Sequence, residues 1–187
     1  NEVILVGGPQ SPLAVTGIPT DLNCFGDASG SVNITITGGT ANYLVNWTSI
    51  GGFTSTNVDI NSLAADTYTV DIEDANGCTL NGTPFIVDEP NDFTITPNIT
   101  QPSCGVADGS ATITVTGGTA AIDYTYVWTD ITAGTVMAET SNTLSNIDAG
   151  NYQIDVTDDN GCSVTDIISV TNDQAPALTI VQTDIDC

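Results

Sequence analysis

The chain has 187 residues, of which 23 are Asp or Glu and none is Lys, Arg or His, so its formal net charge is −23. Without a basic side chain it cannot neutralise phosphates, which excludes nucleic acids and anionic membrane surfaces as partners. The same absence removes catalytic triads, Schiff bases and cationic oxyanion stabilisers, so the sequence predicts no enzyme and no catalytic residue. No apolar run approaches the roughly 20 residues that cross a bilayer, and membrane insertion is not expected.

A repeated unit divides the chain. The sequence from Leu63 to Cys78 recurs without a gap from Ile147 to Cys162. Such self-similarity indicates a repeat array, and copies of roughly 80 residues are large enough for modest cores. The 40% hydrophobic content also favours folded domains over a disordered chain. We expect the end of a preceding repeat at 1–9, a first full immunoglobulin-like repeat at 10–90, a second at 91–174, and the first strand of a following repeat at 175–187.

The first half of each copy predicts three strands. A short strand at Leu13–Val15 follows two prolines, and a turn with a cysteine, Gly and Asp comes next. Residues 32–36 then alternate between β-branched and polar side chains, which is the period of a half-buried strand, until Gly38-Gly39 ends it. The third strand carries Trp47. The counterparts are Phe93–Ile95, residues 112–116, Gly117-Gly118 and Trp128, and the first strand recurs once more at Leu178–Ile180.

The second half of each copy predicts a strand, a corner and a hairpin. Val58 and Ile60 belong to the fourth strand. Tyr68 opens the next strand at the place where sandwich domains have a tyrosine corner. Asn76-Gly77 supplies the positive φ angles that a tight hairpin needs, and Phe85–Val87 forms the last strand. The counterparts are Leu144, Tyr152, Asn160-Gly161 and Ile167–Val170.

These signals together define the fold class. Each copy has about seven short strands, turn signals at intervals of roughly ten residues, and no helical periodicity. A tryptophan in the third strand is the usual central core residue of an immunoglobulin-like sandwich. The sequence therefore predicts an all-β chain of tandem immunoglobulin-like or fibronectin-type β-sandwich repeats.

The motifs resemble the SprB-type repeat of Bacteroidetes cell-surface gliding adhesins, which is related to PKD-like and immunoglobulin-like repeats. The shared pattern is a cysteine, a Gly/Asp turn, a strand ending in Gly-Gly-Thr, a Tyr-x-x-x-Trp strand, a Leu-x-Ala-Gly-x-Tyr corner and an Asp-x-Asn-Gly-Cys hairpin. It spans nearly the whole chain, and Asp66 stands where the first corner would have its glycine. The first copy carries it at Cys24, Gly38–Thr40, Tyr43, Trp47, Leu63–Tyr68 and Asp74–Cys78. The second carries it at Cys104, Gly117–Thr119, Tyr124, Trp128, Ile147–Tyr152 and Asp158–Cys162.

The resemblance implies a structural repeat segment of a very large secreted cell-surface adhesin or filament. Such proteins are exported by the type IX secretion system, and the segment would give mechanical reach for adhesion and gliding at the surface of a bacterium. The expected partners are neighbouring repeats of the same chain, with lateral self-association and a surface or glycan target as open questions. The alternative is a glycan-binding or spacer module of a surface lectin or polysaccharide-processing protein.

The five cysteines lack the C-x-x-C spacing of thiolate metal sites and indicate disulfides formed in an oxidising, extracellular compartment. Pairing within a copy is disfavoured, because seven-residue strands hold the two cysteine-bearing poles roughly 23 Å apart, whereas bridged Cα atoms lie about 4.4–6.8 Å apart. Two alternatives remain open. One joins Cys24 to Cys162, and the other joins Cys78 to Cys104 and Cys162 to Cys187.

Oxygen ligands gather near each hairpin tip, which makes calcium the candidate cofactor. Hard cations take about six to eight oxygen ligands, but no EF-hand or other dedicated calcium spacing is present. The favoured interpretation is a solvated acidic edge that discourages sheet-to-sheet aggregation. The candidate calcium ligands are Asp71, Glu73, Asp74 and Asn76 in the first copy, and Asp155, Asp158, Asp159 and Asn160 in the second.

Overall fold

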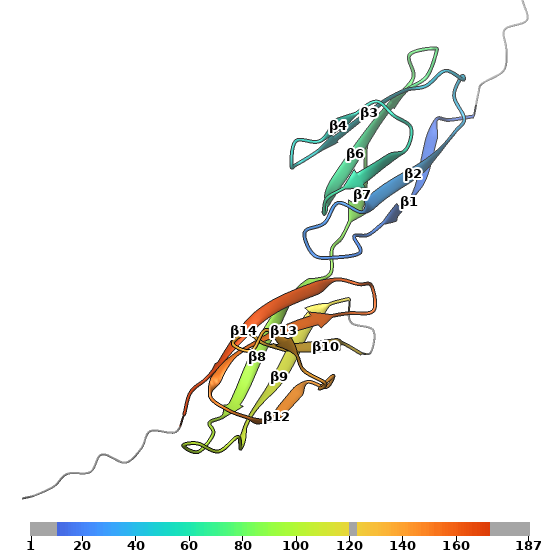
Figure 1. Ribbon diagram of the computed structural model, residues 1–187. Coiled ribbons are helices and arrows are strands. Elements are labelled where there is room, and N and C mark those ends of the chain that lie inside the picture. Colours follow the sequence, from blue (N-terminus) through green and yellow to red (C-terminus); the bar gives the residue numbers. More distant parts are fainter. Residues whose placement is uncertain (1–10, 120–122, 173–187) are drawn as a thin grey trace, which may run out of the picture. The chain divides into compact units, whose positions relative to one another are not determined.

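The computed structural model describes residues 11–119 and 123–172 and divides into two compact units, Asn1–Asp92 and Phe93–Cys187 (Figure 1). The described residues form fourteen β-strands and no helix, so the all-β prediction is confirmed. Among these residues there is accordingly no helix long and apolar enough to cross a membrane. The segments expected at 1–9 and 175–187, with the strand at Leu178–Ile180, lie outside the described residues.

The first unit contains two antiparallel sheets of three and four strands. The three-stranded sheet has the order β1-β2-β5, with β1 at Ala14–Thr20, β2 at Gly30–Thr37 and β5 at Ile60–Leu63. The four-stranded sheet has the order β4-β3-β6-β7, with β4 at Thr54–Ser55, β3 at Leu44–Ser49, β6 at Asp66–Glu73 and β7 at Thr79–Val87.

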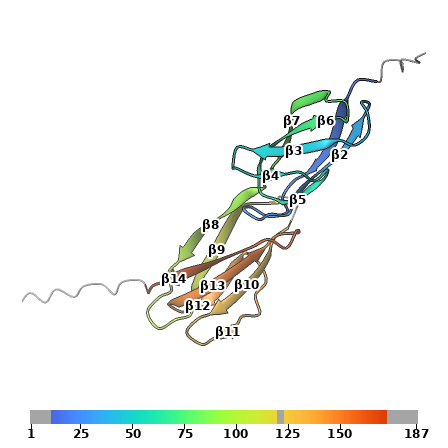
Figure 2. The same cartoon turned by 90° about the horizontal axis from the view of Figure 1, so that it is seen from above.

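The second unit repeats this arrangement strand for strand. Its three-stranded sheet has the order β12-β9-β8, with β8 at Asn91–Thr100, β9 at Gly109–Gly118 and β12 at Thr143–Ile147. The four-stranded sheet has the order β11-β10-β13-β14, with β10 at Thr125–Asp130, β11 at Thr135–Val136, β13 at Gly150–Thr157 and β14 at Ser163–Val170. Figure 2 labels β5 and β11, which Figure 1 leaves unmarked. The prediction of tandem sandwich repeats is confirmed.

Each unit has its own hydrophobic core, built from both of its sheets. Trp47 of β3 and Trp128 of β10 are completely buried, which confirms their predicted central place. Each indole N–H donates to a backbone oxygen at 3.0 Å, that of Asn57 in the first unit and of Ser141 in the second. The predicted alternation also holds in the next strand of each unit, because its inward side chains are all buried: Tyr68, Val70 and Ile72 in β6, and Tyr152, Ile154 and Val156 in β13.

Two strand predictions differ from the structure. The first strand is longer than Leu13–Val15, because β1 continues through Gly17 and Pro19 to Thr20. It pairs with β2 alone, as an edge strand, where a proline loses no ladder hydrogen bond. Val58 does not belong to the strand that was predicted to contain it together with Ile60, because this strand is β5 and begins at Ile60. Val58 is exposed in a bend. On either side of it, the Asn57 carbonyl oxygen accepts the indole N–H of Trp47, and the Asp59 carboxylate accepts the N–H of Ile34.

The hairpin turn also differs from its prediction. Only the glycine of each Asn-Gly pair takes a positive φ, +80° at Gly77 and +83° at Gly161. The Gly77 N–H donates to the Asp74 carbonyl oxygen at 2.9 Å, which closes a four-residue turn that ends at the glycine. This is a type I turn followed by a left-handed glycine, as in longer hairpin loops, and not the two-residue turn that Asn-Gly suggests. The physical reason is the Asp74 side chain, which accepts the Asn76 N–H.

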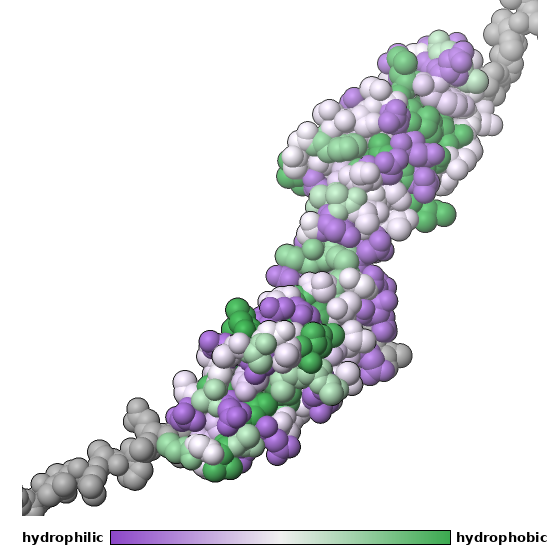
Figure 3. Space-filling view, in the orientation of Figure 1, coloured by the Kyte–Doolittle hydropathy of each residue, from purple (hydrophilic) through white to green (hydrophobic). Residues whose placement is uncertain are grey.

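The surface mixes hydrophilic and hydrophobic residues over each unit on the face that Figure 3 shows. Several large apolar side chains are exposed, and Ile50, Ile18 and Val136 are the most open of them. Single exposed apolar residues of this kind are ordinary on protein surfaces.

Candidate functional site

A buried aspartate organises the hairpin at one pole of each unit. Asp74 is 5% exposed and follows β6 directly. Its Oδ1 accepts the N–H groups of Asn76 at 2.9 Å and Cys78 at 2.8 Å, which orders the turn. Its Oδ2 accepts the N–H of Thr40 at 2.9 Å, from the loop after β2. One carboxylate therefore joins the hairpin to a loop 34 residues earlier in the chain.

The second unit builds the same arrangement around Asp158, which is 7% exposed. Its Oδ1 accepts the N–H groups of Asn160 at 3.0 Å and Cys162 at 2.9 Å. Its Oδ2 accepts both the N–H of Thr119 at 2.9 Å and the hydroxyl of Thr119 at 2.7 Å. The Gly-Gly-Thr and Asp-x-Asn-Gly-Cys motifs are therefore two halves of one hydrogen-bonded unit in both copies.

These hydrogen bonds favour the ionised form of both aspartates. The Cys78 N–H, followed by that of Thr40, lowers the pKa of Asp74 from its ordinary 3.8. Burial acts to raise the pKa of Asp158, but the hydrogen bonds, led by those from Thr119, outweigh it and lower that pKa from 3.8. A carboxylate that accepts several N–H groups is stabilised as an anion without any basic partner. This explains how the chain buries charges while it lacks Lys and Arg.

The two glycines before the threonine make this contact sterically feasible. Gly38 and Gly39 have φ angles of +70° and +60°, and Gly118 in the second copy has +68°. A Cβ on Gly39 would lie 2.9 Å from Oδ2 of Asp74, and one on Gly118 would lie 2.9 Å from Oδ2 of Asp158. Only glycine combines these backbone angles with such a close approach.

The predicted calcium ligands are not brought together as a cation site. Asp74 and Asp158 direct their oxygens to N–H groups of the protein, as described above. Asp71 accepts the N–H of Gly82 at 2.7 Å, and Asp155 accepts hydrogen bonds from the side chain of Gln153. Asn76 donates its side-chain amide to the Thr40 hydroxyl. Glu73, Asp159 and Asn160 are the other three of the eight predicted calcium ligands. Within residues 11–119 and 123–172, no group of three or more His, Cys, Asp or Glu side chains could hold a metal ion.

A tyrosine corner fixes the start of β6 and of β13. The Tyr68 hydroxyl donates to the carbonyl oxygen of Ala64, and the Tyr152 hydroxyl donates to that of Asp148, both at 2.9 Å. Each bond reaches back four residues, and a hydroxyl bond to the backbone a few residues upstream is typical of the tyrosine corner of sandwich domains. Burial is the first cause that raises the pKa of both phenols above 10, with nearby aspartates adding to it.

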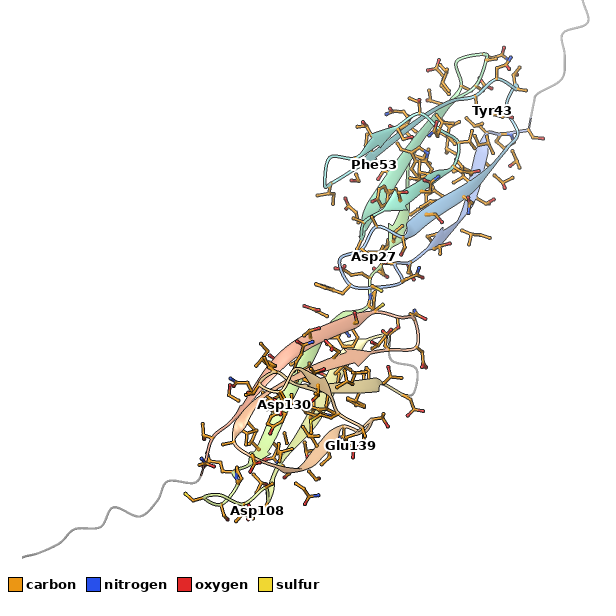
Figure 4. The ribbon with its side chains drawn as sticks, viewed as in Figure 1. Asp27, Tyr43, Phe53, Asp108, Asp130 and Glu139 are labelled. Carbon is orange, nitrogen blue, oxygen red and sulfur yellow. The ribbon has the colours of Figure 1, made fainter. Side chains whose placement is uncertain are left out.

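The turn before β2, and its counterpart before β9, is organised by an aspartate of its own. Asp27 accepts the N–H of Cys24 at 3.1 Å and that of Ser29 at 3.0 Å. In the second copy Asp108 accepts the N–H of Ser103 at 2.6 Å and its hydroxyl at 2.9 Å. The Ser29 N–H is the first cause that lowers the pKa of Asp27, and the Ser103 N–H does the same for Asp108. Figure 4 labels both aspartates.

The cysteines occupy two positions in each copy. We call Cys24 and Cys104 the turn cysteines, since they lie in the turns before β2 and β9. We call Cys78 and Cys162 the hairpin cysteines. Cys24 and Cys162 are disulfide-bonded, whereas Cys78 is exposed and carries a free thiol. Cys104 is exposed, and Cys187 lies outside the described residues.

The turn and hairpin positions of one unit lie at opposite poles. The turn cysteine precedes β2 or β9, and the threonine just after that strand binds the hairpin aspartate. The eight residues of β2 span about 26 Å and the ten of β9 about 33 Å, at roughly 3.3 Å per residue. A disulfide requires Cα atoms within about 7 Å. A bond between the two cysteines of one unit is therefore excluded, in line with the free thiol of Cys78.

Sequence reasoning placed an aspartate in each cysteine turn but missed its hydrogen bonds, and it also missed the threonine contacts of the hairpin. The spacing Asp27-x-Ser29 is a local signal for an aspartate that hydrogen-bonds the backbone two residues on. No local signal could find the contact of Thr40 with Asp74, because 34 residues separate them.

Comparisons with known proteins find two segments that are similar to one repeat family. Two segments, residues 16–52 and 96–133, match the family model of the SprB repeat. No match is found among curated proteins. A solved amphioxus IgVJ-C2 molecule is 14% identical, with 87% of this chain and 98% of that chain covered and a TM-score of 0.34. The Ig1 and Ig2 domains of DIP-gamma are 11% identical, with 88% and 99% covered and a TM-score of 0.42. The BSP domain of a biofilm-associated protein is 18% identical, with 87% and 30% covered and a TM-score of 0.28.

Proposed function

Since the chain carries two SprB-type repeat segments, we propose that it is a structural part of a very large secreted adhesin or filament at a bacterial cell surface. In this role the repeats provide mechanical reach for adhesion or gliding, and the type IX system exports the protein. The observation that carries the proposal is the repetition itself: two matched segments each belong to a sandwich with a complete core of its own. Repeats of this kind lengthen a protein without changing its local structure.

The chemistry of the described residues supports a mechanical role. The buried ionisable groups, Asp74 and Asp158, are engaged in holding loops together. The tyrosine corners and the indole N–H bonds likewise tie side chains to the backbone. With no Lys, Arg or His, the chain also offers no cation to a phosphate or carboxylate ligand.

A glycan-binding module is the second candidate. Sugars are commonly bound on exposed aromatic rings, because a ring offers a large apolar face with little loss of side-chain entropy. Among the described residues, however, Phe25 is the only aromatic side chain in the exposed class, at 49%. The other aromatic rings are buried or half-buried. The spacer form of this alternative therefore fits better than a glycan platform.

The proposal can be tested on cells that produce the protein. Antibodies raised against the 187-residue chain, detected with gold particles in electron micrographs, should label fibres that extend from the cell surface. Labelling confined to the cytoplasm would overturn the proposal. A glycan array probed with the same purified chain decides between the two candidates, because specific binding to one class of glycan would favour the binding module. No binding, together with labelled fibres, is the result we expect.

A further inference from the structure

The sequence holds three Asn-Gly pairs, which begin at Asn76, Asn81 and Asn160. In such a pair the backbone nitrogen of the glycine can attack the side-chain carbonyl carbon of the asparagine, because glycine has no Cβ to hinder the approach. A C–N bond forms, and the amide nitrogen leaves as ammonia together with the proton of the glycine N–H. Water then opens the resulting succinimide ring to an aspartate, or to an isoaspartate in which the former side chain continues the backbone. Since water is the only co-reactant, the fold sets the rate by how firmly it holds the amide and the glycine N–H.

Two of these pairs lie in matched hairpin turns. Asn76 and Asn160 are both exposed, and the backbone N–H of each donates to the buried aspartate of its hairpin. The glycine N–H that must attack donates in both turns to the carbonyl oxygen of that aspartate, at 2.9 Å for Gly77 and 3.1 Å for Gly161. The backbone therefore presents the two asparagines in nearly the same way.

The side-chain amides of these two asparagines differ. Nδ2 of Asn76 donates to the hydroxyl of Thr40 at 2.8 Å. In the second copy the hydroxyl of the corresponding Thr119 is directed to Oδ2 of Asp158 instead, at 2.7 Å. Within residues 11–119 and 123–172, no hydrogen bond of the Asn160 side chain is found. The amide of Asn160 is thus free to turn toward the next backbone nitrogen.

The third pair is held at its glycine. The N–H of Gly82 donates to Oδ1 of Asp71 at 2.7 Å, and Asn81 lies within β7. A hydrogen bond to a carboxylate is stronger than one to a neutral carbonyl oxygen. It also disfavours loss of the N–H proton, because the nitrogen would then face a second negative charge. We therefore expect Asn81 to react slowly.

We propose that Asn160 is a site of spontaneous deamidation and that the Thr40 hydroxyl protects its counterpart Asn76. Ring closure at Asn76 first requires the hydrogen bond to Thr40 to break, which corresponds to about a threefold slower reaction. The product at position 160 would add a carboxylate beside Asp159. An isoaspartate would also lengthen the backbone between the two N–H groups that Asp158 accepts. The inference concerns the chemistry of the hairpin and does not rest on the proposed function.

Incubation of the purified chain at neutral pH and physiological temperature tests the proposal. Samples taken over time are digested with pepsin in acid, where ring closure is slow, and tandem mass spectrometry measures the converted fraction of each asparagine. We expect Asn160 to be converted about threefold faster than Asn76. The chain unfolded in urea is the control, in which the two should react at similar rates. Equal rates of Asn76 and Asn160 in the folded chain, or faster conversion of Asn81 than of Asn160, would overturn the proposal.

Thr40→Val provides a matched variant, because valine has the shape of threonine without its hydroxyl. The bond from the backbone N–H of residue 40 to Asp74 does not depend on this side chain. We expect the variant to raise the rate at Asn76 to that of Asn160 and to leave Asn160 unchanged. An unchanged rate at Asn76 would contradict the protective role of the hydroxyl. Circular dichroism checks that the variant folds, and if it does not, the two rates in the unaltered chain decide alone.

Discussion

Replacement of Tyr152 by Phe isolates one hydroxyl group of the tyrosine corner. The ring is 4% exposed and keeps its packing in the variant, while the hydrogen bond of 2.9 Å to the Asp148 carbonyl oxygen is lost. A typical hydrogen bond contributes about 0.5–1.5 kcal/mol net, and a buried acceptor left without a donor costs about 1–3 kcal/mol. Since the carbonyl is only partly buried and regains some water, we expect a loss of about 1–2 kcal/mol. In a unit of this size each kcal/mol lowers the Tm by about 4–8 °C.

The assay is urea unfolding monitored by tryptophan fluorescence, because each unit contains one buried tryptophan. Tyr68→Phe should destabilise the first unit by a similar amount, since its hydroxyl bond has the same length. Tyr126→Phe is the control, because no hydrogen bond of its hydroxyl is found among the described residues. It should change stability by less than about 0.5 kcal/mol. Equal effects of Tyr152→Phe and Tyr126→Phe would refute the assigned role of the corner.

The remaining predictions concern pH and backbone conformation. The N–H groups of Cys78 and Thr40 lower the pKa of Asp74 from 3.8, so its stabilisation is complete above pH 3.8 and is lost as the pH falls through the folded-state value; acid titration by circular dichroism checks this. Burial raises the pKa of the phenols of Tyr68, Tyr126 and Tyr152 above 10. The stability that these phenols contribute is therefore complete below pH 10 and is lost as the pH rises further, which alkaline titration will show. Gly38→Ala should cost at least about 1 kcal/mol more than Gly52→Ala in urea unfolding. Both residues have a positive φ, but a Cβ at Gly38 would collide with the backbone oxygen of Pro12, whereas a Cβ at Gly52 would meet open space; equal costs would contradict this.

The fold was largely predictable because period-two alternation is a local signal. Residues 68–72 alternate in the sequence as they do in the structure, and one tryptophan per copy identified each core. Strand ends were harder to place, since they depend on neighbours. The edge position of β1 tolerates Pro19, and nothing local announces an edge. A bulge at Ser62, with a φ of +56°, recurs at Asn146 and likewise has no clear sequence signal.

The hairpin site was only half predictable. Clustered acidic residues suggested cation ligands, but Asp74 and Asp158 accept N–H groups from the backbone instead. The sequence shows which carboxylates are close along the chain, whereas the donors from Thr40 and Thr119 arrive from loops 34 and 39 residues away. A motif of Gly-Gly-Thr paired with a distant Asp-x-Asn-Gly-Cys is now a recognisable signal for this contact. The cysteine pairing could be narrowed from the sequence only to two alternatives.

Stretching single molecules of the chain tests the central claim, that it consists of two independently folded repeats whose role is mechanical. Under reducing conditions, each repeat of about 80 residues should unfold in a separate event that releases about 25 nm of chain, at roughly 3.5 Å per residue less the folded length. The account predicts two such events of nearly equal length. A smooth extension without force peaks, or one event of about twice that length, would contradict it.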